Sequence, residues 1–205
     1  MEFISIGPNC TSKDRIIESG LRKCAYPFDS IFSSLDMVKH CIHDRFALFL
    51  DKQYYRQGPH GSTHHLFYSK FLNTEVLRRH HIAHGLIDIA RHLENREIFL
   101  HHNLFNDDTY SAYVRRCQRV LDLLDNNDKI VFVYCDRYTN DFDELIEFYN
   151  HFSDNKNIYV IGIFENNCEK KMLYESPRCK IYQNYDIKSI FDEQNLLTSN
   201  AYFLP

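Results

Sequence analysis

The chain has 205 residues, of which 44% are hydrophobic and 25% are charged. These values are typical of a globular protein, so we expect one domain over residues 1–205 and exclude an intrinsically disordered chain. The formal net charge of −4 provides no broad cationic field, which argues against a nucleic-acid partner. The longest apolar run, Ile130–Cys135, is far shorter than the roughly 20 residues of a membrane-spanning helix, so we expect no membrane association.

The cysteines and the N-terminal residues indicate a reducing compartment. Seven cysteines are an odd number and include no CxxC pair, which favours neither a disulfide framework nor a zinc finger. The chain begins with an acidic residue at position 2 and a short apolar run, which is unlike a secretory signal. We therefore expect a cytoplasmic location. The composition leaves the oligomeric state open.

Five short apolar segments predict strands that are buried on both faces. They are Phe3–Ile6, Ile98–Leu100, Ile130–Cys135, Ile158–Phe164 and Lys180–Gln183. Apolar residues recur at three- and four-residue steps from Tyr110 and again from Phe142, which predicts an amphipathic helix at each place. Strands that alternate with single helices predict an α/β fold of three layers, with a mainly parallel sheet flanked by helices.

The segment from about residue 30 to residue 97 has a different pattern. It is mostly helical in its apolar spacing, and residues 57–61 interrupt it with a Gly-Pro loop. A helical stripe near its end consists of Ile82, Leu86, Ile89 and Leu93. We interpret the segment as a helical insertion that packs over the sheet.

Cys10 is the strongest candidate for a nucleophile. It lies between the first predicted strand and a helix over about residues 12–19, and the carboxyl ends of parallel strands form the functional edge of such sheets. The N–H groups and dipole of a helix N-terminus favour an anion, so we expect a lowered thiol pKa or a stabilised oxyanion there. In the alternative interpretation Asn9 and its neighbours are only helix caps, and Cys10 is a small buried side chain.

His101 and His102 are the candidate bases. They follow the predicted strand Ile98–Leu100, so they would reach the same edge as Cys10 if the two strands are parallel. Successive residues of an extended chain point in opposite directions, so one of the two would face the thiol. We favour His102, which lies further along toward the edge, next to Asn103. Either histidine could instead be a loop residue bonded to a carbonyl group.

Two acids compete as the residue that orients the histidine. Asp29 follows an apolar turn and would act as a triad acid or bind substrate; alternatively, it caps a helix that begins near Ser30. Asp136 ends the strand Ile130–Cys135 and is the second candidate. No metal site is expected, because His80, His84, Asp88 and His92 share one helix face without a separate ligand cluster.

Six short blocks resemble a known family. They are Ile4–Cys10, Gly20–Lys23, Tyr26–Asp29, His101–Leu104, Tyr113–Val120 and Ile130–Tyr134. Their order and spacing resemble the putative papain-like cysteine peptidase family, a domain family of unknown function found in bacteria and large DNA viruses. The resemblance extends from about residue 3 to residue 165. It implies a nucleophile at Cys10 and a histidine at His101 or His102. Ser30 follows the Pro-Phe-Asp element, where the family often has a tryptophan, and this difference concerns substrate contacts.

Three function classes follow from these residues. The first is a cysteine-dependent hydrolase of peptide or ester bonds that needs no cofactor. The second is an acyltransferase, because the block ending at Cys10 is similar to capsule-biosynthesis proteins that bind coenzyme A. An acyl carrier would then contact cations such as Lys13 and Arg15, with Asn9 and Asn103 as further substrate contacts. The third is a non-catalytic binding module, which would tolerate loss of Cys10.

Overall fold

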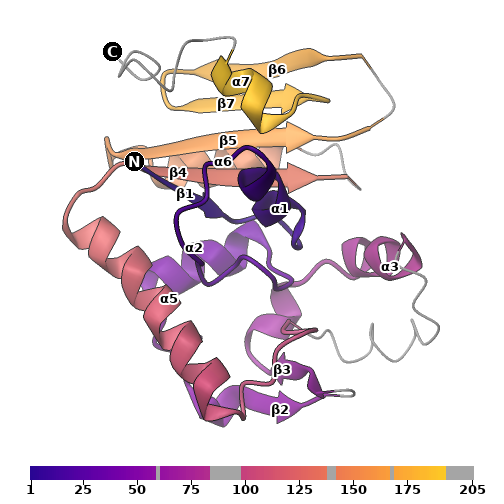
Figure 1. The fold of residues 1–205 in the computed structure, drawn as a ribbon, viewed down its shortest axis with the longest axis vertical. Helices are drawn as coiled ribbons and strands as arrows, with labels where there is room; N and C mark the ends of the chain where they lie inside the picture. The colour runs from indigo at the N-terminus through magenta and orange to yellow at the C-terminus, as the bar shows by residue number, and fades with distance from the viewer. Residues whose placement is uncertain (59–60, 84–97, 138–141, 167–168, 193–205) are drawn as a thin grey trace.

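The computed structural model describes residues 1–58, 61–83, 98–137, 142–166 and 169–192 (Figure 1). They contain a five-stranded sheet in the order β1-β4-β5-β7-β6. The strands are β1 (Glu2–Ser5), β4 (Ile130–Asp136), β5 (Ile158–Phe164), β6 (Lys171–Ser176) and β7 (Cys179–Gln183). Four of them run parallel, and β6 pairs antiparallel with β7 at the edge. This mixed, mainly parallel sheet flanked by helices confirms the predicted α/β class.

The central strands of the sheet are buried on both faces because helices cover each side. Every residue of β4 and β5 is buried, which explains their continuous apolar sequences. Alternate residues of β4 enter opposite cores: Val131 packs with Ile16 and Ile187 on one face, and Phe132 with Leu145 and Phe148 on the other. The first core lies under α1 (Thr11–Glu18) and α7 (Ile187–Asp192), and the second under α6 (Asp143–His151).

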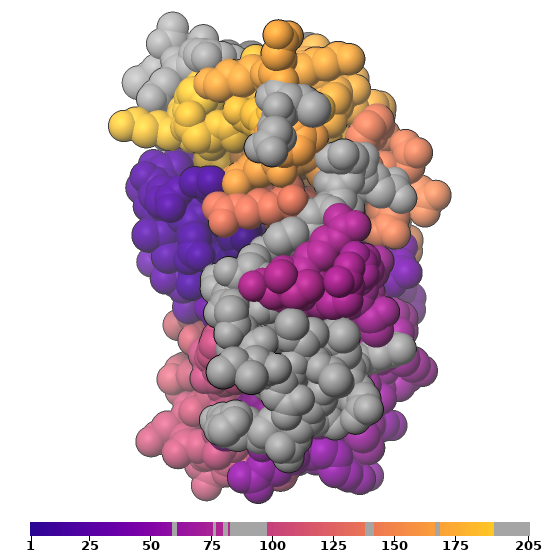
Figure 2. Space-filling view, turned by 90° about the vertical axis from the view of Figure 1, so that its right-hand side faces the viewer, coloured from indigo at the N-terminus to yellow at the C-terminus, as the bar shows by residue number. Residues whose placement is uncertain are grey.

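The carboxyl ends of β4 and β5 lie at one edge of the molecule. Figure 2 views this edge, with the β1–α1 segment in indigo on one side and α3 (Thr74–Ala83) in magenta below the strand ends. The long helix α5 (Asp107–Asp125) leads into β4, and its buried residues include Tyr113, Cys117 and Leu121. The predicted helical periodicity from Tyr110 is therefore confirmed, although Val114 is exposed.

One predicted strand is wrong. Ile98–Leu100 is not part of the five-stranded sheet; Phe99 instead forms an isolated antiparallel bridge with Thr63, with N···O distances of 3.1 Å in both directions. Ile98 and Phe99 are fully buried and Leu100 is half-buried, and a short apolar run of this kind has the same sequence pattern in a loop as in a strand. His101 therefore follows a bridge to the insertion and not a strand of the sheet.

The described part of the insertion contains both helices and a small hairpin. Its elements are α2 (Leu35–His43), η1 (Lys52–Tyr54), β2 (Tyr55–Gln57), β3 (Thr63–His65), η3 (Tyr68–Phe71) and α3. The antiparallel β2–β3 pair was not predicted. Ile82 is 52% exposed, so it does not belong to a core-facing stripe. Leu86, Ile89 and Leu93 lie outside the described residues.

A buried histidine links the hairpin to the rest of the insertion. His65 is fully buried; its Nε2–H donates to the Leu48 carbonyl oxygen (2.9 Å), and its Nδ1 accepts from the Tyr68 backbone N–H (3.3 Å). Both ring nitrogens are therefore used by the neutral imidazole. Burial is the main reason that the pKa of His65 is lowered to about 4.

We predict that the protein loses stability in acid partly through His65. The unfolded chain binds a proton on this residue near pH 6.5, whereas the folded chain binds it only near pH 4. The free energy of unfolding should therefore fall between these pH values, with a contribution of up to about 1.4 kcal/mol per pH unit. Urea denaturation of His65→Gln should show a less steep fall, and the exposed His43→Gln variant should behave like the unmodified protein. Equal pH dependence in His65→Gln would contradict this role.

Candidate active site

The turn between β1 and α1 is held close to the sheet. The Cys135 backbone N–H donates to Ser12 Oγ (2.8 Å), and Ser33 Oγ donates to the Gly7 carbonyl oxygen (2.8 Å). A Cβ atom on Gly7 would lie 1.9 Å from Ser12 Oγ, so the close approach requires glycine. This packing places Cys10 at the carboxyl edge of the sheet.

Cys10 occupies the position directly before α1, with its backbone already helical. Asn9 is buried, and its Oδ1 accepts from the Thr11 backbone N–H (2.9 Å). Asn9 therefore supports the first turn of the helix, as the capping interpretation expects. Cys10 itself is half-buried, and its side chain makes no capping bond.

The pKa of the Cys10 thiol is raised, which is opposite to the direction expected from the helix N-terminus. Burial is the largest cause, and the negative charge of Asp14 and a hydrogen bond to its carboxylate raise the pKa further. The positive charge of Lys13 acts in the opposite direction. The resting side chain is therefore a protonated thiol near neutral pH.

Cys10 and His101 line the same small hollow, although 90 residues separate them in the chain. We call it the Cys10 hollow. The rest of its wall consists of Asn9, Ser30, Ile31, Phe32 and Leu100. The Phe32 backbone N–H donates to the Ile98 carbonyl oxygen (2.9 Å), which joins the two segments. His101 is exposed to solvent. Within the described ranges, no hydrogen bond joins the Cys10 thiol to His101 or His102.

His102 lies beside Tyr113 and is not among the described residues that line the Cys10 hollow. Their ring centroids are 5.5 Å apart, with the rings nearly perpendicular, and the His102 Nε2 atom is buried without a hydrogen-bond partner. Burial, followed by the positive charge of Arg116, lowers the pKa of His102 to about 4. This ring is consequently neutral at pH 7.

Asp29 forms its hydrogen bonds within its own turn. It is buried, and its Oδ2 accepts from Arg22 Nη2 (2.8 Å) and from the Tyr26 backbone N–H (3.0 Å). The helix after it begins only at Leu35 and is capped by Ser34, whose Oγ accepts from the Met37 N–H (3.1 Å). Asp29 therefore stabilises the turn that leads to the Cys10 hollow, and no described hydrogen bond connects it with a histidine.

The other predicted substrate contacts are separated in space. Asn103 Oδ1 accepts from the Phe105 backbone N–H (3.0 Å). Lys13 Nζ lies 3.0 Å from Asp14 Oδ1 and donates to Ser30 Oγ (3.4 Å), beside the Cys10 hollow. Arg15 turns toward the end of β5, where its Nε lies 2.6 Å from Glu165 Oε1. Lys13 and Arg15 therefore each have a different partner within the chain.

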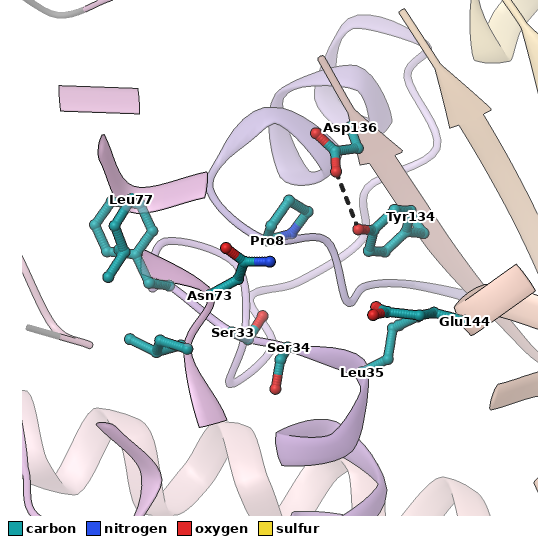
Figure 3. A pocket seen from close by; sticks show the side chains of 11 residues that line it. Pro8, Ser33, Ser34, Leu35, Asn73, Leu77, Tyr134, Asp136 and Glu144 are labelled. Carbon is teal, nitrogen blue, oxygen red and sulfur yellow. Dashed lines mark hydrogen bonds between the residues drawn. The ribbon is translucent and has the colours of Figure 1, made fainter. Parts of the chain in front are cut away.

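Asp136 is fully buried at the end of β4, and Tyr134 Oη donates to its Oδ2 (3.2 Å). It lines a different cavity from Cys10, and Pro8, Ser33, Ser34 and Asn73 contribute to the same wall (Figure 3). This position does not support Asp136 as the orienter of a histidine at the Cys10 hollow.

The sequence analysis assigned no role at the site to Asp14, Tyr113 or Arg116, although it singled out Ser30 as a position that concerns substrate contacts. Asp14 is four residues after Cys10 on a predicted helix, so its proximity could have been inferred from helical spacing. The Arg116 guanidinium lies 4.8 Å from the centroid of the Tyr113 ring, and its positive charge lowers the pKa of His102. That contact depends on the fold of residues 98–102, which the sequence pattern did not reveal.

The described residues contain no group of three or more His, Cys, Asp or Glu side chains arranged to hold a metal ion. His84, Asp88 and His92 lie outside these residues. In the same described part of the chain, no helix is long and apolar enough to cross a membrane.

A protein-family model matches most of the chain. The model of the putative papain-like cysteine peptidase family, a domain of unknown function, matches residues 1–160. No curated protein and no solved structure is significantly similar to the chain. The matched region includes the β1–α1 turn, the insertion and the segment that carries His101. The chain therefore belongs to the putative papain-like cysteine peptidase family.

Proposed function

We propose that the protein is a cysteine-dependent hydrolase of acyl bonds, with Cys10 as the nucleophile and His101 as the general base. The observation that carries the proposal is that these two side chains line one hollow at the carboxyl edge of the sheet. Peptides and esters are the substrate classes that this chemistry serves. The protein itself needs no cofactor for this reaction.

The raised pKa of Cys10 explains why a base is needed. A protonated thiol is a weak nucleophile, so His101 accepts the thiol proton as Sγ attacks the carbonyl carbon. N–H groups at a helix N-terminus stabilise negative charge, and α1 begins directly after Cys10, where the oxyanion would develop. His101 then protonates the leaving group, and water hydrolyses the Cys10 thioester with His101 again as base.

His101 is a better candidate base than His102, which the sequence had favoured. His102 is absent from the described lining of the hollow, and its pKa of about 4 makes it a weak proton acceptor near pH 7. Its neutral ring, packed against Tyr113, supports the backbone that presents His101.

The cytoplasm, where cysteines stay reduced, remains the proposed location.

Hydrolysis is favoured over acyl transfer by the surroundings of the thiol. His101 is exposed, so water reaches the base that would activate it. Arg15 is engaged by Glu165 and Glu18, and Lys13 by Asp14 and Ser30, so these cations have partners within the chain. Coenzyme A binding therefore has no separate support.

The proposal predicts that hydrolysis depends on Cys10. Cys10→Ala should reduce hydrolysis of p-nitrophenyl esters or peptide thioesters at least about a hundredfold, because it removes the nucleophile. Cys24→Ala is the matched control, since Cys24 is also half-buried and lies outside the Cys10 hollow. Activity that survives in Cys10→Ala, or an unmodified protein that hydrolyses none of these substrates, would count against the hydrolase.

The assignment of the base predicts different effects for the two histidines. His101→Ala should lower kcat/KM for the same substrates by about 10²-fold or more, which is the usual contribution of a general base. His102→Gln should have a smaller effect and should lower thermal stability, because its ring packs on Tyr113. A larger loss of activity in His102→Gln, with unchanged stability, would reassign the base.

The charges beside the thiol predict opposite effects on its reactivity. Asp14→Asn removes a cause of the raised pKa, so the thiolate fraction at pH 7.5 should increase and alkylation of Cys10 by iodoacetamide should become about threefold faster. Lys13→Met should slow it, because the lysine stabilises the thiolate. The effects are modest because the Asp14 side chain is 49% exposed.

Peptide mapping after limited alkylation measures both rates. Glu18→Gln, one turn further along α1, is the control and should leave the rate of Cys10 alkylation unchanged. If Asp14→Asn and Lys13→Met change the rate in the same direction, the electrostatic account of the thiol is wrong.

A further inference from the structure

Ser30 brings a hydroxyl group to the wall of the Cys10 hollow. The residue is half-buried, and among the described residues of this wall it alone carries a hydroxyl side chain. The hollow measures about 20 Å³, which is room for one small polar group such as a carbonyl oxygen. A group that occupies the hollow is therefore close to both Cys10 and Ser30.

Lys13 determines how the Ser30 hydroxyl can act. Lys13 lies three residues after Cys10, in the first turn of α1, and its Nζ donates to Ser30 Oγ (3.4 Å). An ammonium group has no acceptor, so Ser30 Oγ is the acceptor in this contact and its own O–H stays available as a donor. The positive charge of Lys13 also acts on the pKa of both Cys10 and His102, which agrees with a position beside the hollow.

One N–H group at the start of α1 is already engaged. Attack on a carbonyl group turns its oxygen into an oxyanion, which is stabilised by hydrogen-bond donors aimed at it. The Thr11 N–H is the first of the helix, and it donates to Asn9 Oδ1 (2.9 Å) rather than into the hollow. A side-chain donor in the wall would replace it. A hydroxyl group that accepts from an ammonium is a stronger donor than an isolated one, because the positive charge polarises it.

We propose that Ser30 is a further catalytic residue, which donates a hydrogen bond to the carbonyl oxygen of the substrate, and that Lys13 positions its hydroxyl. This step rests on the proposed function, in which Cys10 is the nucleophile. When the bond between Sγ and the carbonyl carbon forms, the thiol proton passes to His101 and one electron pair of the C=O bond moves to oxygen, where Ser30 stabilises it. The C=O bond then re-forms, the leaving group takes the proton from His101, and Ser30 keeps its own proton throughout.

Two reactions of Cys10 separate this role from a general effect on the thiol. p-Nitrophenyl acetate acylates the thiol through an oxyanion, whereas iodoacetamide alkylates it by displacement of iodide, without one. Ser30→Ala should slow acylation at least about tenfold, because one oxyanion donor typically contributes about a hundredfold or more, and should change alkylation less than about threefold. Ser19→Ala is the matched control, since Ser19 is also half-buried and lies at the other end of α1, outside the described wall.

The positioning role of Lys13 is tested by its coupling to Ser30. Lys13→Met lowers the thiolate fraction and so slows both reactions, but it should slow acylation at least about threefold more than alkylation. In a Ser30→Ala background this excess loss should vanish, because the hydroxyl that Lys13 positions is absent. Lys13→Arg, which keeps a charged donor, should recover most of the excess loss.

The outcomes distinguish this proposal from the proposed function. Equal slowing of acylation and alkylation in Ser30→Ala, or no effect on either, would overturn the role of Ser30, while acetylation of Cys10 in the unmodified protein would keep the hydrolase. An excess loss from Lys13→Met that is the same with and without Ser30 would overturn the positioning role. No acetylation of Cys10 in the unmodified protein, together with normal alkylation, would reject the hydrolase and with it the role of Ser30.

Discussion

The hydrogen bond from the Cys135 backbone N–H to Ser12 Oγ determines where both pockets lie. It ties the first turn of α1 to the carboxyl end of β4 at a distance that only glycine at position 7 permits. Pro8 then lines the cavity that contains Asp136, and Cys10 lines the Cys10 hollow two residues later. Replacement of Gly7 by alanine would force this turn away from β4, and both walls would move with it.

The insertion completes the site because it bonds to the same turn. Ser33 donates to the Gly7 carbonyl oxygen, and Phe32 bonds to the carbonyl oxygen of Ile98, so the segment from Ser30 to Ser33 lies between the β1–α1 turn and the histidine-bearing segment. His101 lines the same hollow as Cys10 because of this three-part arrangement, and not because it follows a neighbouring strand of the sheet. The positions of the proposed base and nucleophile therefore depend on aromatic packing in the insertion, around Phe49 and Phe99.

The parts of the fold that a sequence predicts well are those in which one physical pattern has one interpretation. β4 and β5 could be predicted because strands buried on both faces have unbroken apolar sequences. α5 could be predicted because its apolar residues recur at three- and four-residue steps. Ile98–Leu100 was misassigned because burial among aromatic rings gives the same apolar run as burial in a sheet. β6 was missed because its residues are exposed or only half-buried, as in an edge strand.

In the candidate site, too, features that depend on the local sequence could be predicted and features that depend on long-range contacts could not. Cys10 could be located from the strand–helix junction alone, but its pKa depends on Asp14 and on burial, which outweigh the helix N-terminus. The sequence favoured His102, whereas His101 is the histidine that lines the Cys10 hollow. Which of the two faces the hollow depends on the path of a loop, which the sequence does not reveal. Asp29 was assigned catalytic and capping roles, whereas its buried carboxylate bonds Arg22 and the Tyr26 backbone. Long-range partners of this kind leave no local sequence pattern.

The most direct test of the account is to trap the acyl intermediate. The unmodified protein is mixed with p-nitrophenyl acetate at pH 7, quenched in acid within the first turnover, and analysed by intact mass spectrometry and peptide mapping. The account predicts one acetyl group on the peptide that contains Cys10, lost with time in the unmodified protein and retained longer in His101→Ala. Acetylation confined to another cysteine or to lysines, with Cys10 unmodified, would contradict it.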